Sequence, residues 1–140
     1  MMVKNFTFAS SLVVTLGLSA CAMEQDAPDL SVERGKMLFA QKCAVCHGTD
    51  ATGAGAASLG LGGPPPDLTT LSAQNRGVFP SDFVMSVIDG FNRRDHPSSA
   101  MPEFGNDDLG PLVQVEDGGA STPIPADLVA LAAYIESIQR

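Results

Sequence analysis

The sequence predicts an all-α domain in which three main helices are joined by long loops rich in glycine and proline. Apolar side chains recur at helical spacing in three segments, residues 31–42, 81–89 and 125–139. The stretches between these segments contain most of the glycines and prolines, and none alternates as a long strand. One weak signal for extended structure covers residues 112–115, closed by residues 117–119.

Each predicted helix has recognisable boundary residues. The first begins at Ser31, whose hydroxyl is a suitable N-cap. The second begins at Ser81, which we expect to cap it, and ends at Gly90, a residue type favoured after helix C-termini. In the third, Pro125 fits the first turn, and one apolar stripe runs along the helix. That stripe consists of Leu128, Leu131, Ile135 and Ile138.

The strongest chemical signal is Cys43-Ala44-Val45-Cys46-His47, in which an imidazole directly follows two closely spaced thiols. This is the spacing for covalent haem attachment, where each thiol joins one vinyl group and the histidine becomes an axial iron ligand. A structural zinc site needs four ligands, but the remaining cysteine, Cys21, lies in a targeting segment, and His96 is the other histidine. No βαβ pattern supports a thioredoxin-like pair. We therefore expect this motif to hold one haem c, and wrapping the cofactor would account for the long loops.

The N-terminus predicts export. Residues 1–20 form a signal peptide, in which Lys4 precedes an apolar run too short to span a bilayer. Leu18-Ser19-Ala20-Cys21 resembles a bacterial lipobox, whose cysteine is lipidated; cleavage after Ala22 and an uncleaved anchor are the alternatives. Residues 21–30 then form a polar tether to a single domain, residues 31–140. We expect a periplasmic-side protein held on a membrane through Cys21.

The formal net charge of −8 limits the classes of partner. Nucleic-acid binding is not expected, because it requires a basic surface. Redox partners steered by charge would present positive surface, although an acidic surface also serves solubility alone. Both interpretations of the charge remain open.

Further features accompany the haem motif in a fixed order. Gly35 and Phe39 precede it, Pro66-Asp67-Leu68 follows it, and a short helix ending in Gly90 comes before Met101-Pro102-Glu103-Phe104. Leu131 and Tyr134 lie on the last helix. In this order the features resemble class I monohaem c-type cytochromes, and the resemblance covers residues 31–140. It implies the cytochrome c fold, with the terminal helices crossing at Gly35, Phe39, Leu131 and Tyr134.

We expect Met101 to be the sixth iron ligand, opposite His47. Histidine and methionine ligation raises the haem potential, which suits electron transfer. Met85 and Met37 lie among apolar helix residues and are expected in the core. His96 is the competing ligand but is expected to face solvent, and an open sixth position is the other alternative.

The resemblance also implies supporting residues around the haem. The carbonyl of Pro66 would accept a hydrogen bond from the ring of His47, although the adjacent Pro64 and Pro65 leave this register open. Two loops, residues 91–100 and 110–123, are longer than in smaller relatives. They are expected to serve partner recognition or to form a lid over a haem edge, and neutral loop growth is the alternative. Buried haem propionates would need donors, and the candidates are Asn75, Arg76, Asn92, Arg93 and Arg94; the alternative is that these are exposed loop residues without such a role.

The function that follows is one-electron transfer between a redox protein donor and acceptor, in a periplasmic or membrane-surface chain, with no catalysis on a substrate. One alternative is a haem-bearing subunit of a periplasmic oxidoreductase complex. The other is a haem sensor or peroxidase in which Met101 is displaceable.

Overall fold

The computed structural model describes residues 27–61, 63–91, 101–117 and 119–140. The predicted signal peptide and Cys21 lie outside these residues, as do Asn92, Arg93, Arg94 and His96. None of the helices in the described ranges combines the length and the apolar character needed to cross a membrane.

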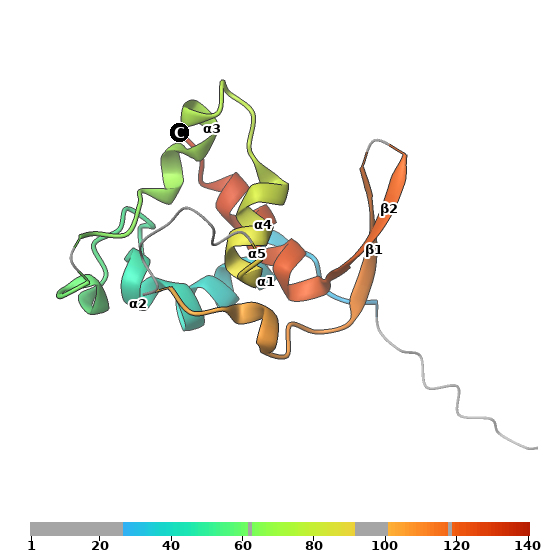
Figure 1. Ribbon diagram of the computed structural model, residues 1–140, viewed down its shortest axis with the longest axis horizontal. Coiled ribbons are helices and arrows are strands. Elements are labelled where there is room, and N and C mark those ends of the chain that lie inside the picture. Colours follow the sequence, from blue (N-terminus) through green and yellow to red (C-terminus); the bar gives the residue numbers. More distant parts are fainter. Residues whose placement is uncertain (1–26, 62, 92–100, 118) are drawn as a thin grey trace, which may run out of the picture.

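The fold consists of short helices and one small hairpin (Figure 1). The helices are α1 (Val32–Leu38), η1 (Phe39–Cys43), α2 (Ala44–His47), η2 (Ala56–Ser58), η3 (Leu68–Thr70), α3 (Leu71–Gln74), α4 (Ser81–Asp89), η4 (Phe104–Asn106) and α5 (Ala126–Ser137). The strands are β1 (Leu112–Asp117) and β2 (Ala120–Pro125).

The N-terminal helix runs without a break from α1 through η1 to α2. As predicted, Ser31 caps it, and its hydroxyl accepts a hydrogen bond of 3.1 Å from the amide of Arg34. The η1 turn is π-helical, and the amide that follows it donates to the carbonyl of Phe39. We had expected this helix to stop at Lys42, but it continues to His47 and carries the whole haem motif.

The first and last helices cross as predicted. A methyl group added at Gly35 would lie 2.6 Å from the carbonyl carbon of Ala130, so only glycine allows this approach. The rings of Phe39 and Tyr134 meet with their centroids 5.3 Å apart. Leu131 is 1% exposed and completes the crossing.

An ion pair fastens the same two helices at the start of α5. The guanidinium of Arg34 donates to both carboxylate oxygens of Asp127, at 2.9 and 2.8 Å. Asp127 is buried, so this two-bond pairing supplies the partners that its carboxylate needs.

Helix α4 matches the predicted bounds, but its N-terminus differs from the prediction. Pro80 occupies the N-cap position and Ser81 is the first helical residue, so the predicted Ser81 cap is wrong. Gly90 ends the helix with φ 99°, a left-handed conformation that suits glycine.

The core is built mainly from α1, α4 and α5, and the two expected core methionines behave differently. Met85 is buried, as predicted. Met37 is 50% exposed, so its assignment to the core is wrong. Gly35, Leu38 and Phe39 form the buried side of the first helix, and Met37 lies off that side.

Residues 112–125 form an antiparallel hairpin in which Val113 pairs with Ile124. The all-α prediction is therefore right for the helices and wrong for this segment, where only a short extended stretch was expected. The second strand was not predicted because it contains Pro123 and Pro125, and proline has no N–H to donate to a neighbouring strand. They are tolerated here because each strand of a two-stranded hairpin has a free edge. The hairpin projects from the helical body (Figure 1).

Candidate functional site

The two motif thiols lie on one continuous stretch of helix. Cys43 ends η1 and Cys46 lies in α2, and neither forms a disulfide. Both residues are half-buried. Burial raises the pKa of Cys43 to about 11, so this thiol is protonated at neutral pH. The structure therefore holds two unpaired thiols at the spacing expected for two thioether bonds.

His47, directly after Cys46, has a buried imidazole. Its Nδ1 atom makes no well-formed hydrogen bond to any described residue. The backbone of Pro66 nevertheless interacts with the ring: burial lowers the pKa of His47, and this interaction opposes the shift. Proline has no N–H, so the interacting group is the Pro66 carbonyl. Of the three consecutive prolines, Pro66 is thus the one placed beside the imidazole.

The loop after the motif folds back onto the motif backbone. The amide of Gly53 donates to the carbonyl of His47 at 2.8 Å, and that of Gly55 donates to Cys46 at 3.1 Å. A methyl group at Gly55 would lie 2.5 Å from the carbonyl carbon of Cys46. We did not predict these two glycines as site residues. Their signal was the repeated glycine immediately after the haem motif, where the backbone must come close.

The loop also binds the Pro66 segment. The amide of Leu68 donates to the carbonyl of Ala51 at 2.9 Å. A methyl group at Gly53 would lie 3.1 Å from the carbonyl carbon of Pro65. Backbone contacts therefore connect the haem motif to the prolines through this loop.

Met101 lies distant from the motif in sequence, but the segment that follows it is docked beside the motif. Met101 is half-buried and packs against the hydrophobic core. Lys42, directly before Cys43, forms an ion pair of 3.2 Å with Asp107. Its ammonium also lies 5.9 Å from the centre of the Phe104 ring. In Figure 1 this orange segment leads from Met101 toward β1.

The end of α4 holds the same segment from another side. A methyl group at Gly105 would lie 2.5 Å from the carbonyl oxygen of Asp89, and one at Gly90 would lie 2.7 Å from Cγ of Glu103. These close contacts, with those of Lys42, limit where the Met101 loop can lie. Gly105 was not predicted as a site residue, and a single loop glycine carries no distinctive signal.

The residues present fit a covalently held haem. The free thiols would attach the haem, and the buried imidazole of His47, with the Pro66 carbonyl beside it, would bind the iron and have its ring N–H held. Large apolar side chains are exposed in the motif and in the segments between it and Met101. They are Val45, Leu59, Leu61, Val78, Phe83 and Phe91. Within the described ranges, no group of three or more His, Cys, Asp or Glu side chains could hold a bare metal ion.

The fold and the site together define a helical haem-binding protein. The family model for cytochrome c matches residues 32–139, and the chain belongs to this family. The family makes the protein a haem-based electron carrier whose cofactor is haem c with its iron. Neither the curated proteins nor the solved structures contain a match to the chain.

Proposed function

We propose that this chain is a one-electron carrier with a single covalent haem and with His47 and Met101 as axial ligands. The observation that carries this proposal is the docking of the Met101 segment on Lys42, directly beside Cys43. When bound, the haem supplies the Fe(II)/Fe(III) couple. The chain holds the cofactor, provides both axial ligands and keeps water from the iron.

Each residue has a separate task. The thiols of Cys43 and Cys46 hold the haem through two thioether bonds. With haem bound, the Pro66 carbonyl would accept a hydrogen bond from the Nδ1–H of His47, which would orient the imidazole and leave its other nitrogen for iron. The thioether sulfur of Met101 would hold the iron together with His47, and a soft sulfur ligand would keep the potential high.

With both axial positions filled, the iron has no site for a substrate, and we propose that the protein is not an enzyme. Its partners are a redox protein donor and acceptor that approach the haem edge in small, transient contacts. The net charge of −8 favours partners with positive surface. Permanent residence in a periplasmic oxidoreductase complex is the second candidate, supported by the hairpin that projects from the body.

The test of this function is a measurement on the haem-loaded protein. We expect haem to remain attached after denaturation, a reversible one-electron couple in voltammetry, and no rapid carbon monoxide binding by the reduced protein. The double variant Cys43→Ala/Cys46→Ala should lose haem on denaturation. Rapid carbon monoxide binding would instead identify a sensor or peroxidase with a displaceable Met101. Co-purification in a stable complex would favour the oxidoreductase subunit.

We also propose that the mature protein is lipid-anchored through Cys21 on the periplasmic side of a bacterial membrane. Multiple acyl chains give firm attachment. Cys21→Ser should move the haem-staining protein from the membrane fraction to the soluble periplasmic fraction, and mass spectrometry should find acyl chains on Cys21 in the wild type alone. A wild-type chain beginning at Met23 would show ordinary cleavage after Ala22. A Cys21→Ser protein that stays in the membrane would refute the lipid anchor.

A further inference from the structure

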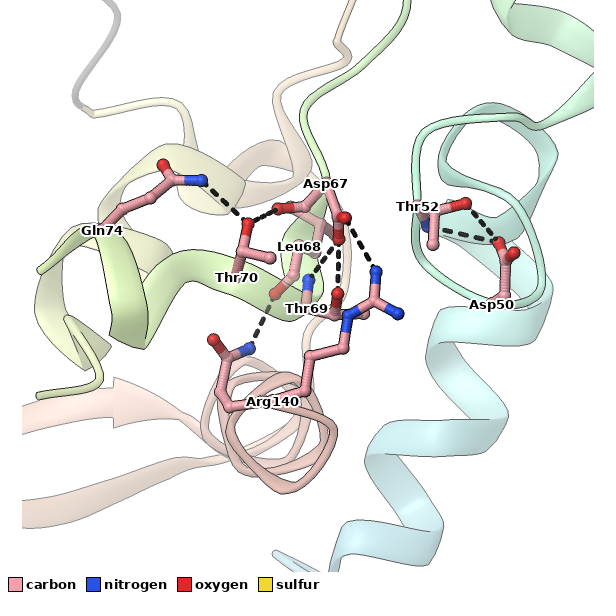
Figure 2. A network of polar contacts seen from close by, with 9 residues as sticks. Asp50, Thr52, Asp67, Leu68, Thr69, Thr70, Gln74 and Arg140 are labelled. Atoms are coloured by element: carbon pink, nitrogen blue, oxygen red, sulfur yellow. Dashed lines mark hydrogen bonds and ion pairs between the residues drawn. The ribbon is translucent and has the colours of Figure 1, made fainter. Parts of the chain in front are cut away.

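Two residues that follow α5 bind the chain segment next to Pro66. Gln139 and Arg140 come directly after the last helical turn, and their partners lie about 70 residues earlier in the sequence, between Asp67 and Ser72. Figure 2 shows Arg140 directed at the carboxylate of Asp67. We call Gln139 and Arg140 the C-terminal clamp.

Gln139 uses both ends of its side-chain amide. The nitrogen donates to the carbonyl of Leu68 at 2.7 Å and to the carbonyl of Ile135 at 2.8 Å. The oxygen accepts a hydrogen bond of 2.8 Å from the amide of Ser72. Gln139 therefore ties the Leu68–Ser72 stretch to the last turn of α5.

Arg140 makes two further contacts with the same stretch. Its guanidinium donates to Oδ2 of Asp67 at 3.1 Å, and its own amide donates to the carbonyl of Thr69 at 3.0 Å. The other Asp67 oxygen, Oδ1, accepts from the amide and the hydroxyl of Thr69, at 2.9 and 2.6 Å (Figure 2). Asp67 thus joins a local turn to a distant residue, and it directly follows Pro66.

The clamped stretch is in turn connected to the haem motif. Leu68, whose carbonyl Gln139 holds, donates its own amide to Ala51 at 2.9 Å. Ala51 lies in the loop where Gly53 donates to the carbonyl of His47 at 2.8 Å. Pro66 is the last residue of the proline run and directly precedes these fixed residues. The placement of its carbonyl therefore depends on them.

We propose that Gln139 and Arg140 are positioning residues that hold the Pro66 carbonyl beside the imidazole of His47. This inference rests on the proposed function, in which His47 is an iron ligand. In the haem-loaded protein, a carbonyl held close to the ring N–H would make the imidazole a stronger donor to iron, because an acceptor for that N–H raises the basicity of the ligand. Releasing the clamp should move the carbonyl away from the ring and raise the reduction potential.

The test compares four haem-loaded variants with wild type. Arg140→Gln is the mild variant, since this side chain is 65% exposed and its loss should not prevent folding. The double variant Gln139→Leu/Arg140→Gln removes the side-chain hydrogen bonds of Gln139 and the ion pair of Arg140 with Asp67. Arg34→Gln is the matched control, because it breaks an Arg–Asp pair at the other end of α5, away from Pro66.

The decisive readouts are the exchange rate of the His47 ring N–H proton, followed by NMR in the reduced protein, and the reduction potential. We expect exchange to be about tenfold faster in the double variant, as for the loss of one hydrogen bond. The potential should rise, and Arg140→Gln should give a smaller shift in both readouts. Arg140→Lys should stay close to wild type in both readouts, because it keeps a cation near Asp67.

The control separates positioning from plain stabilisation. Arg34→Gln should lower the melting temperature while leaving ring-proton exchange and potential at wild-type values. If the clamp variants do the same, Gln139 and Arg140 are structural only and the inference is wrong. A wild type without covalent haem would contradict the proposed function itself, and haem staining of the denatured wild type reveals that outcome first.

Discussion

Gly35→Ala is expected to force α1 and α5 apart where they cross and to lower the free energy of unfolding. The added methyl group would meet the carbonyl of Ala130 and lie 2.8 Å from Cβ of Tyr134. Alanine gains about 1 kcal/mol in helix propensity over glycine. Overpacking costs about 1–3 kcal/mol and occasionally more, and backbone atoms cannot move aside as a flexible side chain can, so we expect the steric cost to exceed the gain in helix propensity.

The measurement is thermal or chemical unfolding of haem-loaded Gly35→Ala, together with the yield of haem-loaded protein. Gly63→Ala is the matched control, because a methyl group there would find no atom within 4 Å. We expect Gly63→Ala to unfold like the wild type. Equal stability of the two variants would mean that α1 and α5 do not approach as closely as described.

Met101→Ala is expected to remove the sixth iron ligand. The oxidised protein should lose the weak long-wavelength band that reports sulfur bound to iron. The reduction potential should fall by tenths of a volt, on the order of the shifts that axial ligands produce. The reduced protein should also bind carbon monoxide, because the position opposite His47 would be open.

Two control variants test whether Met101 alone has this role. Met37→Ala removes a methionine that is 50% exposed on the first helix and should leave the band and the potential unchanged. His96→Ala removes the competing ligand and should also leave the band intact. A wild type without the band, or an unchanged Met101→Ala spectrum, would rule out sulfur ligation. Loss of ligation in His96→Ala would assign the sixth position to His96.

Local pattern predicted the three main helices, and the family resemblance predicted where the first and last of them cross. Residues 81–89 combine apolar periodicity with a terminal glycine, and the observed helix has the same bounds. Gly35 and Tyr134 were predicted to meet because they match a family pattern, and the contact is confirmed. The assignment of Ser81 as cap failed because Pro80 already occupies that position, which residue preference alone does not reveal.

Other parts of the site depend on contacts that leave no local pattern. Two ion pairs, Arg140 with Asp67 and Lys42 with Asp107, each join charged residues from segments that are distant in the sequence. Charged residues are common on every surface, so their pairing emerges only once the helices have packed. The role of Cys43 in haem attachment and the roles of His47 and Met101 as iron ligands stay predictions. The structure supplies the scaffold around these residues.

The π-helical turn η1 changes the direction in which side chains point between the first and second halves of the N-terminal helix. In a regular α-helix, Phe39 and Cys43 would lie almost one above the other, four residues apart. The wider turn from Phe39 to Cys43 rotates everything after it relative to everything before it. The face that packs on α5 and the face that carries the haem motif are therefore oriented independently. The spacing of four residues between Phe39 and Cys43 therefore does not place their side chains on the same side of the helix, as it would in a regular α-helix.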